Sequence, residues 1–126
     1  MMTYVWVGLG GFVGANARYL LSNWVAMRWG STLPWGTLVI NLSGSFLLCF
    51  LFMVAGGRLM LSPPLRLALA VGFLGSYTTF STLSYEWLVL LQQGDLPRSL
   101  GYLCSSIIGG GLAGGLGLLL GRLVSA

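Results

Sequence analysis

The side chains of this sequence that could do chemistry are mostly uncharged hydroxyl and amide groups. Of 126 residues, 56% are hydrophobic and only 6% are charged. The acidic residues are Glu86 and Asp95, and the six basic residues are all arginine, with no lysine and no histidine. Acid–base, nucleophilic and metal-ion catalysis need more titratable or metal-binding groups than this. We therefore expect no enzymatic activity.

The most polar stretch runs from residue 72 to residue 86 and reads GFLGSYTTFSTLSYE. Two glycines, six serine and threonine residues and one carboxylate make it too polar for a plain lipid-facing helix. Such residues favour local unwinding, and backbone carbonyls freed at membrane depth must line a cavity or bind a cation. The segment therefore predicts a break within a helix.

Beyond the expected break, two apolar side chains share a helix face. Phe80 and Leu83 lie three residues apart, with Ser81 and Thr82 turned to other sides. The edge of a phenyl ring is positive, so it can lie beside a small anion without offering a fixed charge. The other interpretation of Phe80 is packing against lipid or core.

Further polar groups occur in other apolar segments. The amide of Asn41 has two donors and one acceptor, which suits either an interhelical hydrogen bond or an anion path. Tyr102, Ser106 and Gly110 are spaced by four, and the hydroxyls of this stripe suit either an ion track or interhelical bonding. Arg18 either snorkels to the membrane interface or attracts anions to a vestibule. Hydroxyl and amide donors with no lysine or arginine at their centre favour the passage of a small, strongly hydrated anion.

Four apolar segments must position these groups. They cover residues 4–25, 35–56, 65–91 and 99–120. Each reaches the ~20 residues that a helix needs to cross ~30 Å of hydrocarbon. Glycine, proline and arginine mark the connections, which are too short for a soluble domain. We predict an all-α membrane protein with one transmembrane domain over residues 1–126, made of four transmembrane helices of which the third is broken.

The twenty glycines concentrate in the first and fourth of these segments. Pairs such as Gly10 with Gly14 and Gly117 with Gly121 have the spacing that lets membrane helices approach closely. We interpret them as packing residues.

The arginines in the connections give almost no orientation signal. Arg58, Arg66 and Arg122 fall on the side of the N-terminus, and Arg28 and Arg98 fall on the other. Such a chain either inserts both ways and forms an antiparallel homodimer, or one orientation prevails by a small margin. Four short helices hardly enclose a pathway, which favours a partner subunit. Because the arginines are scattered, we expect no nucleic-acid partner.

The sequence resembles the Fluc (CrcB-type) family of small fluoride channels along all four segments. The matching stretches are residues 10–15 with Arg18 and Tyr19, residues 35–37 with Asn41 and Gly44, residues 72–75, and residues 78–82. The signature TTFST behind GFLG is specific to that family. The resemblance implies a dual-topology antiparallel homodimer, in the bacterial inner membrane, that passively exports cytoplasmic fluoride.

The resemblance also implies roles for individual residues. It places on the fluoride pathway Asn41, Phe80, Ser81, Thr82, Leu83, Tyr102 and Ser106. Arg18 resembles the vestibule arginine of the family. The carbonyls of Gly75 and Thr78 would meet their symmetry mates around a structural sodium ion at the dimer centre.

Two positions depart from the family pattern. Leu83 stands where a second phenylalanine is usual, so one ring edge is replaced by an apolar wall, which affects rate or selectivity rather than fold. Gly110 stands where related tracks often carry another hydroxyl.

Two other functions fit a small chain of this kind. A proton-coupled multidrug exporter would need a membrane-embedded carboxylate, typically in the first helix, and the first segment has no Asp or Glu. A membrane assembly subunit without transport activity would need only the glycine-mediated packing.

Overall fold

The computed structural model describes residues 1–57 and 60–126, and this part of the chain is helical apart from short connections. The helices are α1 (Met2–Trp29), α2 (Trp35–Gly56), α3 (Pro63–Leu67), the π-helix η1 (Ala68–Leu74), α4 (Gly75–Tyr77), α5 (Phe80–Gln92) and α6 (Leu96–Ser125). Arg58, which entered the orientation count, lies outside the described residues.

Three helical segments are long and apolar enough to cross a membrane. They are Trp35–Gly56, Pro63–Gln92 and Leu96–Ser125. The all-helical prediction is confirmed, and so is the bend in the third segment. At 28 residues α1 is long enough to span, but Asn16, Arg18 and Asn23 lower its apolar character. The fourth span stays a prediction.

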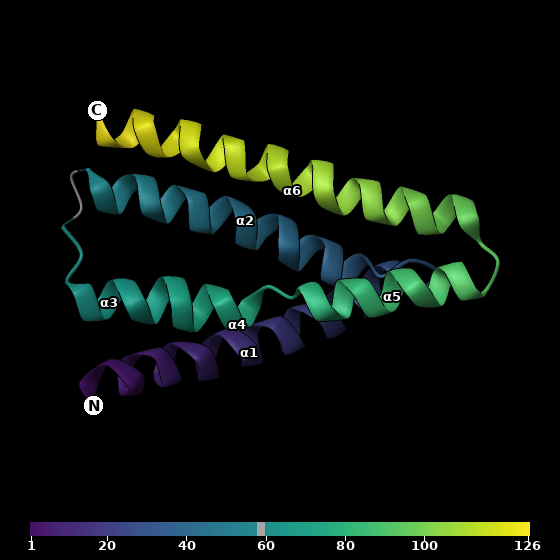
Figure 1. Ribbon diagram of the computed structural model, residues 1–126, viewed down its shortest axis with the longest axis horizontal. Coiled ribbons are helices and arrows are strands. Elements are labelled where there is room, and N and C mark those ends of the chain that lie inside the picture. Colours follow the sequence, from purple (N-terminus) through teal and green to yellow (C-terminus); the bar gives the residue numbers. More distant parts are fainter. Residues whose placement is uncertain (58–59) are drawn as a thin grey trace.

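The third segment is interrupted between α4 and α5 (Figure 1). Thr78 and Thr79 are extended there, with ψ 158° at Thr78 and φ −152° at Thr79. The polar composition of residues 72–86 predicted this interruption. The sequence did not indicate η1, the π-helical stretch that comes before it.

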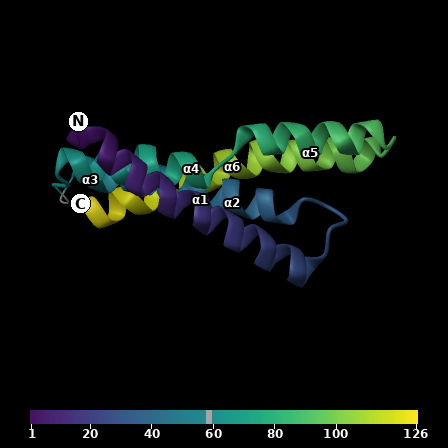
Figure 2. The ribbon, with the colours of Figure 1, turned by 90° about the horizontal axis from the view of Figure 1, so that it is seen from below.

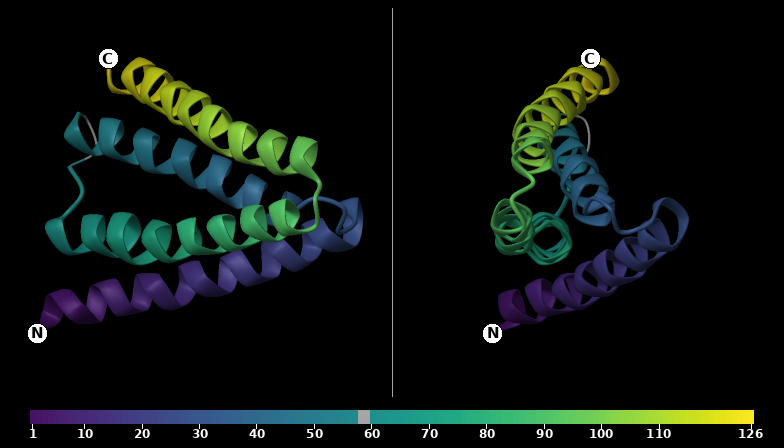
Figure 3. Two further views of the ribbon diagram at one scale, coloured as in Figure 1. Left: turned by 45° about the vertical axis from the view of Figure 1, so that its right-hand side comes forward. Right: turned by 90° about the vertical axis from the view of Figure 1, so that its right-hand side faces the viewer.

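Consecutive long segments run antiparallel, because each connection is short. Both termini, the end of α2 and the start of α3 lie at one end of the molecule, and the connections between α1 and α2 and between α5 and α6 lie at the opposite end (Figure 1). Seen from two further sides, α1 and α6 flank the molecule and α2 lies between them (Figure 3). The first half of α6 runs beside α5 (Figure 2).

Glycines allow the closest helix contacts. A Cβ added at Gly14 would overlap the backbone oxygen of Phe73 in η1, and one at Gly117 would overlap the backbone oxygen of Phe46 in α2. Neither helix pair could come this close with larger residues at those positions. The structure thus supports the packing interpretation of these glycines.

Among the described residues, two clusters of buried apolar side chains lie one on each side of the break. Ile40, Leu74 and Tyr77 make the first, on the α4 side. Leu83, Leu90 and Tyr102 make the second, between α5 and α6. The break is therefore held between two packed regions that position its polar groups.

Candidate functional site at the helix break

Asn41 on α2 replaces the missing helical hydrogen bonds at the break. Its Oδ1 accepts from the backbone N–H of Thr79 at 2.8 Å, and its Nδ2 donates to the Thr79 carbonyl at 2.9 Å. An unpaired backbone group at membrane depth is costly, so this amide satisfies both groups of one residue. Its second N–H remains available to another acceptor.

Hydrogen bonds at the break remove the usual helical donors of the Gly75 and Thr78 carbonyls. In a continuous helix the Thr79 N–H would donate to the Gly75 carbonyl, and the Thr82 N–H to the Thr78 carbonyl. Here the Thr79 N–H donates to Asn41, and the Thr82 N–H donates to the Thr79 Oγ1 at 3.2 Å. Gly75 and Thr78 therefore lose their usual helical donors, and the ion site that the resemblance implies for their carbonyls stays a prediction.

Thr79 starts the second half of the broken segment as the N-cap of α5. Its hydroxyl accepts from the Thr82 N–H and donates to the Thr82 Oγ1 at 3.0 Å. A threonine at this position is a common helix start because its side chain pairs an otherwise free N–H. Thr79 is buried, whereas Ser81 and Thr82 are exposed on the surface of the single chain.

A cavity of about 230 Å³ lies beside the break. Its walls are formed by Asn41, Gly44, Ser45, Leu48, Thr78, Thr79, Phe80 and Leu83. Phe80 and Leu83 share it, as their spacing predicted, but they differ in surroundings. Phe80 is 80% exposed, and Leu83 is only 8% exposed within the cluster that contains Tyr102.

Glu86 joins three helices through hydrogen bonds. The Thr37 hydroxyl on α2 donates to its Oε1 at 2.9 Å, and the Tyr102 hydroxyl on α6 donates to its Oε2 at 2.7 Å. Both carboxylate oxygens thus have a hydroxyl donor, which offsets the cost of placing a charge within the membrane. Chemically, the pair of hydroxyls is a place where a negatively charged group is stabilised.

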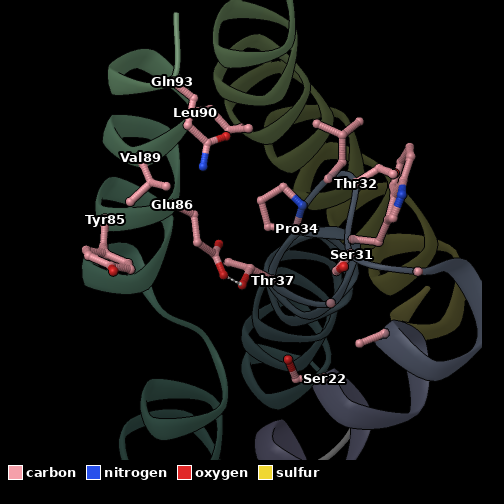
Figure 4. Close-up of a pocket in the computed structure, with 15 residues that line it drawn as sticks. Ser22, Ser31, Thr32, Pro34, Thr37, Tyr85, Glu86, Val89, Leu90 and Gln93 are labelled. Atoms are coloured by element: carbon pink, nitrogen blue, oxygen red, sulfur yellow. Dashed lines mark hydrogen bonds between the residues drawn. The ribbon is translucent and has the colours of Figure 1, made fainter. Parts of the chain in front are cut away.

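A second cavity, of about 330 Å³, is lined in part by Glu86 (Figure 4). Its walls come from the end of α1, the connection to α2 and the outer part of α5, with polar side chains at Ser22, Thr37 and Gln93. Glu86 points from α5 toward Thr37 at its inner end (Figure 4). The cavity leads from the end of the bundle toward the three-helix contact.

The stripe on α6 lies against α2 and α5. Tyr102 and Ser106 are both buried, and the Ser106 hydroxyl donates to the Tyr102 carbonyl at 2.8 Å. The stripe thus contributes one interhelical bond, through Tyr102, and one bond within α6. Arg18 is half-buried on α1 and lines neither of the two cavities.

Sequence reasoning did not assign Thr37 and Glu86 to the site. Glu86 is the only acidic residue within an apolar segment, and this was the available signal. Its partners come from residues 49 and 16 positions away, so their meeting depends on how α2 and α6 pack beside α5.

Comparison with known proteins identifies the family. The sequence matches the family described as CrcB-like protein, Camphor Resistance (CrcB), over residues 5–118. The chain belongs to the CrcB-like family. Together with its three candidate spans, this makes it a multi-pass bacterial membrane protein.

Several CrcB-like relatives carry a functional name. A protein of Acidobacterium capsulatum named fluoride-specific ion channel FluC is 43% identical over 125 residues, covering 99% of this chain and all of the relative. One of the same name from Magnetococcus marinus is 47% identical over 123 residues, covering 98% and 100%. A third, from Koribacter versatilis, is 50% identical over 92 residues, or 73% of each chain.

Removal of the Asn41 amide tests its role in holding the break. We expect Asn41→Ala to lower the free energy of unfolding by roughly 1–3 kcal/mol, because both backbone groups of Thr79 lose their partner. Unfolding of the purified protein in detergent measures this. Asn23→Ala, at an exposed position on α1, is the matched control. Equal stability of the two variants would contradict the assignment.

Proposed function

We propose that this CrcB-like chain forms a fluoride-selective channel that passively exports cytoplasmic fluoride across the bacterial inner membrane. The observation that supports it most is the break, where uncharged amide and hydroxyl groups form part of the wall of a cavity within the membrane-spanning part of the chain. Relatives that cover nearly the whole chain are named as fluoride-specific channels. The proposal extends that activity to this chain.

The chemistry of the site suits a small anion that must enter and leave. Fluoride is strongly hydrated, so it needs donors to replace its water. The free N–H of Asn41, nearby hydroxyls and the edge of the Phe80 ring offer such contacts without a fixed positive charge. A buried arginine or lysine would hold the anion too tightly for conduction.

The remaining pathway residues fit the proposal in different ways. Leu83 gives the cavity an apolar wall, and the exposed Ser81 and Thr82 offer hydroxyls on the surface next to Phe80. Tyr102 and Ser106 extend the track along α6 toward the Glu86 contact. Arg18 acts from the vestibule, by attracting anions over a distance rather than by contact.

A second copy of the chain explains what one copy leaves uncovered. Phe80, Ser81 and Thr82 are exposed beside the break, and hydroxyls facing hydrocarbon are unfavourable. An antiparallel copy would cover this face, and the nearly even division of the connection arginines, three against two, allows insertion in both orientations. With α1 as a fourth span, the assembly would be a dual-topology homodimer.

The carbonyls of Gly75 and Thr78 fit a structural sodium ion in such a dimer. Each has lost its helical donor, and Gly75 is exposed next to the face that the second copy would cover. Two carbonyls from each copy would surround a hard monovalent cation with oxygen dipoles, which is suitable coordination for sodium. When bound, the ion would offset the partial negative charges that meet there.

The alternative functions find less support. Proton-coupled drug export requires a carboxylate that exchanges protons for substrate, and Glu86 is the only acidic residue within the apolar segments, with both oxygens already hydrogen bonded. A passive assembly subunit would have no need for amide and hydroxyl groups in the wall of a cavity at the break.

Fluoride efflux from liposomes tests the proposed activity. Liposomes that contain only the purified protein, loaded with potassium fluoride, should release fluoride once a potassium ionophore is added, because a passive channel needs no other energy source. Chloride-loaded liposomes are the matched control and should release far less. Absence of fluoride release, or equal release of chloride, would overturn the proposal.

Counting of subunits in a bilayer tests the assembly and its ion. Single-molecule photobleaching should show two subunits per particle in sodium chloride, with a labelled terminus accessible from both sides of the membrane. Replacement of sodium by N-methylglucamine should reduce fluoride release, because the four carbonyls would then repel one another. A monomer, a single orientation or an unchanged rate would contradict the corresponding part.

The leucine at position 83 should limit the rate or selectivity of conduction. We expect Leu83→Phe to raise fluoride release, or its ratio to chloride release, by roughly two- to tenfold, since a second ring edge would face the cavity. Leu88→Phe, which makes the same change at an exposed position of α5, is the control. Unchanged release by a correctly assembled Leu83→Phe variant would show that a second ring is dispensable.

A further inference from the structure

Ser45 of α2 faces the position on α6 that lacks a hydroxyl. A Cβ built on Gly110 would have the Ser45 Oγ as its nearest neighbour, at 3.7 Å, and no other atom within 4 Å. Gly110 follows Ser106 by one helical turn on the polar stripe. The hydroxyl of Ser45 therefore lies beside the space into which a serine at position 110 would project.

Ser45 also belongs to the cavity at the break. It lines that cavity together with Asn41 and Phe80, one turn along α2 from Asn41. Its position thus joins two features that the sequence treated as separate, the stripe on α6 and the donors at the break. A hydroxyl here lies in the cavity wall and next to Gly110, the position one turn beyond Ser106.

The Ser45 hydroxyl can rotate away from its present acceptor without leaving that acceptor unpaired. The Oγ donates to the Asn41 carbonyl at 2.7 Å. Within α2 that carbonyl is also the ordinary acceptor for the backbone N–H of residue 45, so it keeps a partner when the hydroxyl rotates away. A serine O–H turns about a single bond and can present its proton to an anion in the cavity.

We propose that Ser45 is a fluoride-contacting residue of this chain, and that it supplies from α2 the hydroxyl that Gly110 does not supply from α6. This inference rests on the proposed channel function and adds a specific donor to its pathway. Ser45 donates to the ion as it moves between the cavity at the break and the Ser106 stripe. Gly110 leaves room for this hydroxyl, because it has no side chain to fill the space.

Transfer of the hydroxyl between helices tests the inference. Ser45→Ala should lower fluoride release from liposomes by roughly ten- to a hundredfold, which corresponds to the loss of one hydrogen bond to a charged group. In the Ser45→Ala background, Gly110→Ser should restore most of the release, since a Cβ at 110 is in ordinary contact distance and its Oγ would enter the same space. Release by the unmodified chain is measured in parallel.

Two controls separate a pathway hydroxyl from a structural one. Gly110→Ala in the Ser45→Ala background adds the same carbon without the oxygen, and it should restore nothing. All variants are compared by subunit counting and by thermal unfolding in detergent, and a pathway role requires that assembly be unchanged. A structural role of Ser45 within α2 would instead lower stability and would not respond to a hydroxyl on α6.

The outcomes are distinct. Fluoride release by Ser45→Ala equal to that of the unmodified chain would overturn the inference, and so would a loss that Gly110→Ser does not restore. Restoration by Gly110→Ala would also overturn it, because space filling would then be the cause. If the unmodified chain released no fluoride, the proposed function itself would fail, whatever the variants do.

Discussion

The structure of the site depends on two hydrogen bonds between the side-chain amide of Asn41 and the backbone of Thr79 at the helix break. A helix interrupted within a membrane exposes polar backbone groups to lipid, which cannot form hydrogen bonds with them. Asn41 satisfies the N–H and the carbonyl of Thr79 at once, so the interruption costs little. The other features of the site lie at this pairing: Thr79 caps the start of α5, the carbonyls of Gly75 and Thr78 lose their donors, and a cavity lies beside them.

The scarcity of charged residues determines which groups stabilise the carboxylate of Glu86. Within residues 1–57 and 60–126 no arginine forms an ion pair with this carboxylate, and two hydroxyls from different helices stabilise it instead. The bonds therefore link α2, α5 and α6 next to the buried cluster of Leu83, Leu90 and Tyr102. A hydroxyl is a weaker partner than an arginine and can be exchanged, so the link holds the helices without fixing the carboxylate permanently.

Hydropathy and composition predicted the long helices and the break, because both depend on local sequence. The length of the apolar segments and the cluster of hydroxyl residues around Phe80 were sufficient for that. The partner of Asn41 and the contacts of Glu86 were not predictable, because they depend on which helices lie side by side. The π-helix η1 was also missed; its backbone packs tightly on Gly10 and Gly14 of α1, a tertiary constraint without a local signal. The dimer, the sodium ion and the fourth span stay predictions.

The proposed pathway is divided between groups that one chain fixes and groups that only an assembly can fix. Thr79, Leu83 and Tyr102 are buried in a single copy, so their positions are set by folding, and a change at Leu83 alters the packed core and the cavity wall together. Phe80 is 80% exposed, so little of its ring is packed against the rest of the same chain. A ring edge can discriminate between anions only when it is held at a fixed distance from them. Selectivity should therefore arise when a second copy packs on this face, even though most of the donors are in place before assembly.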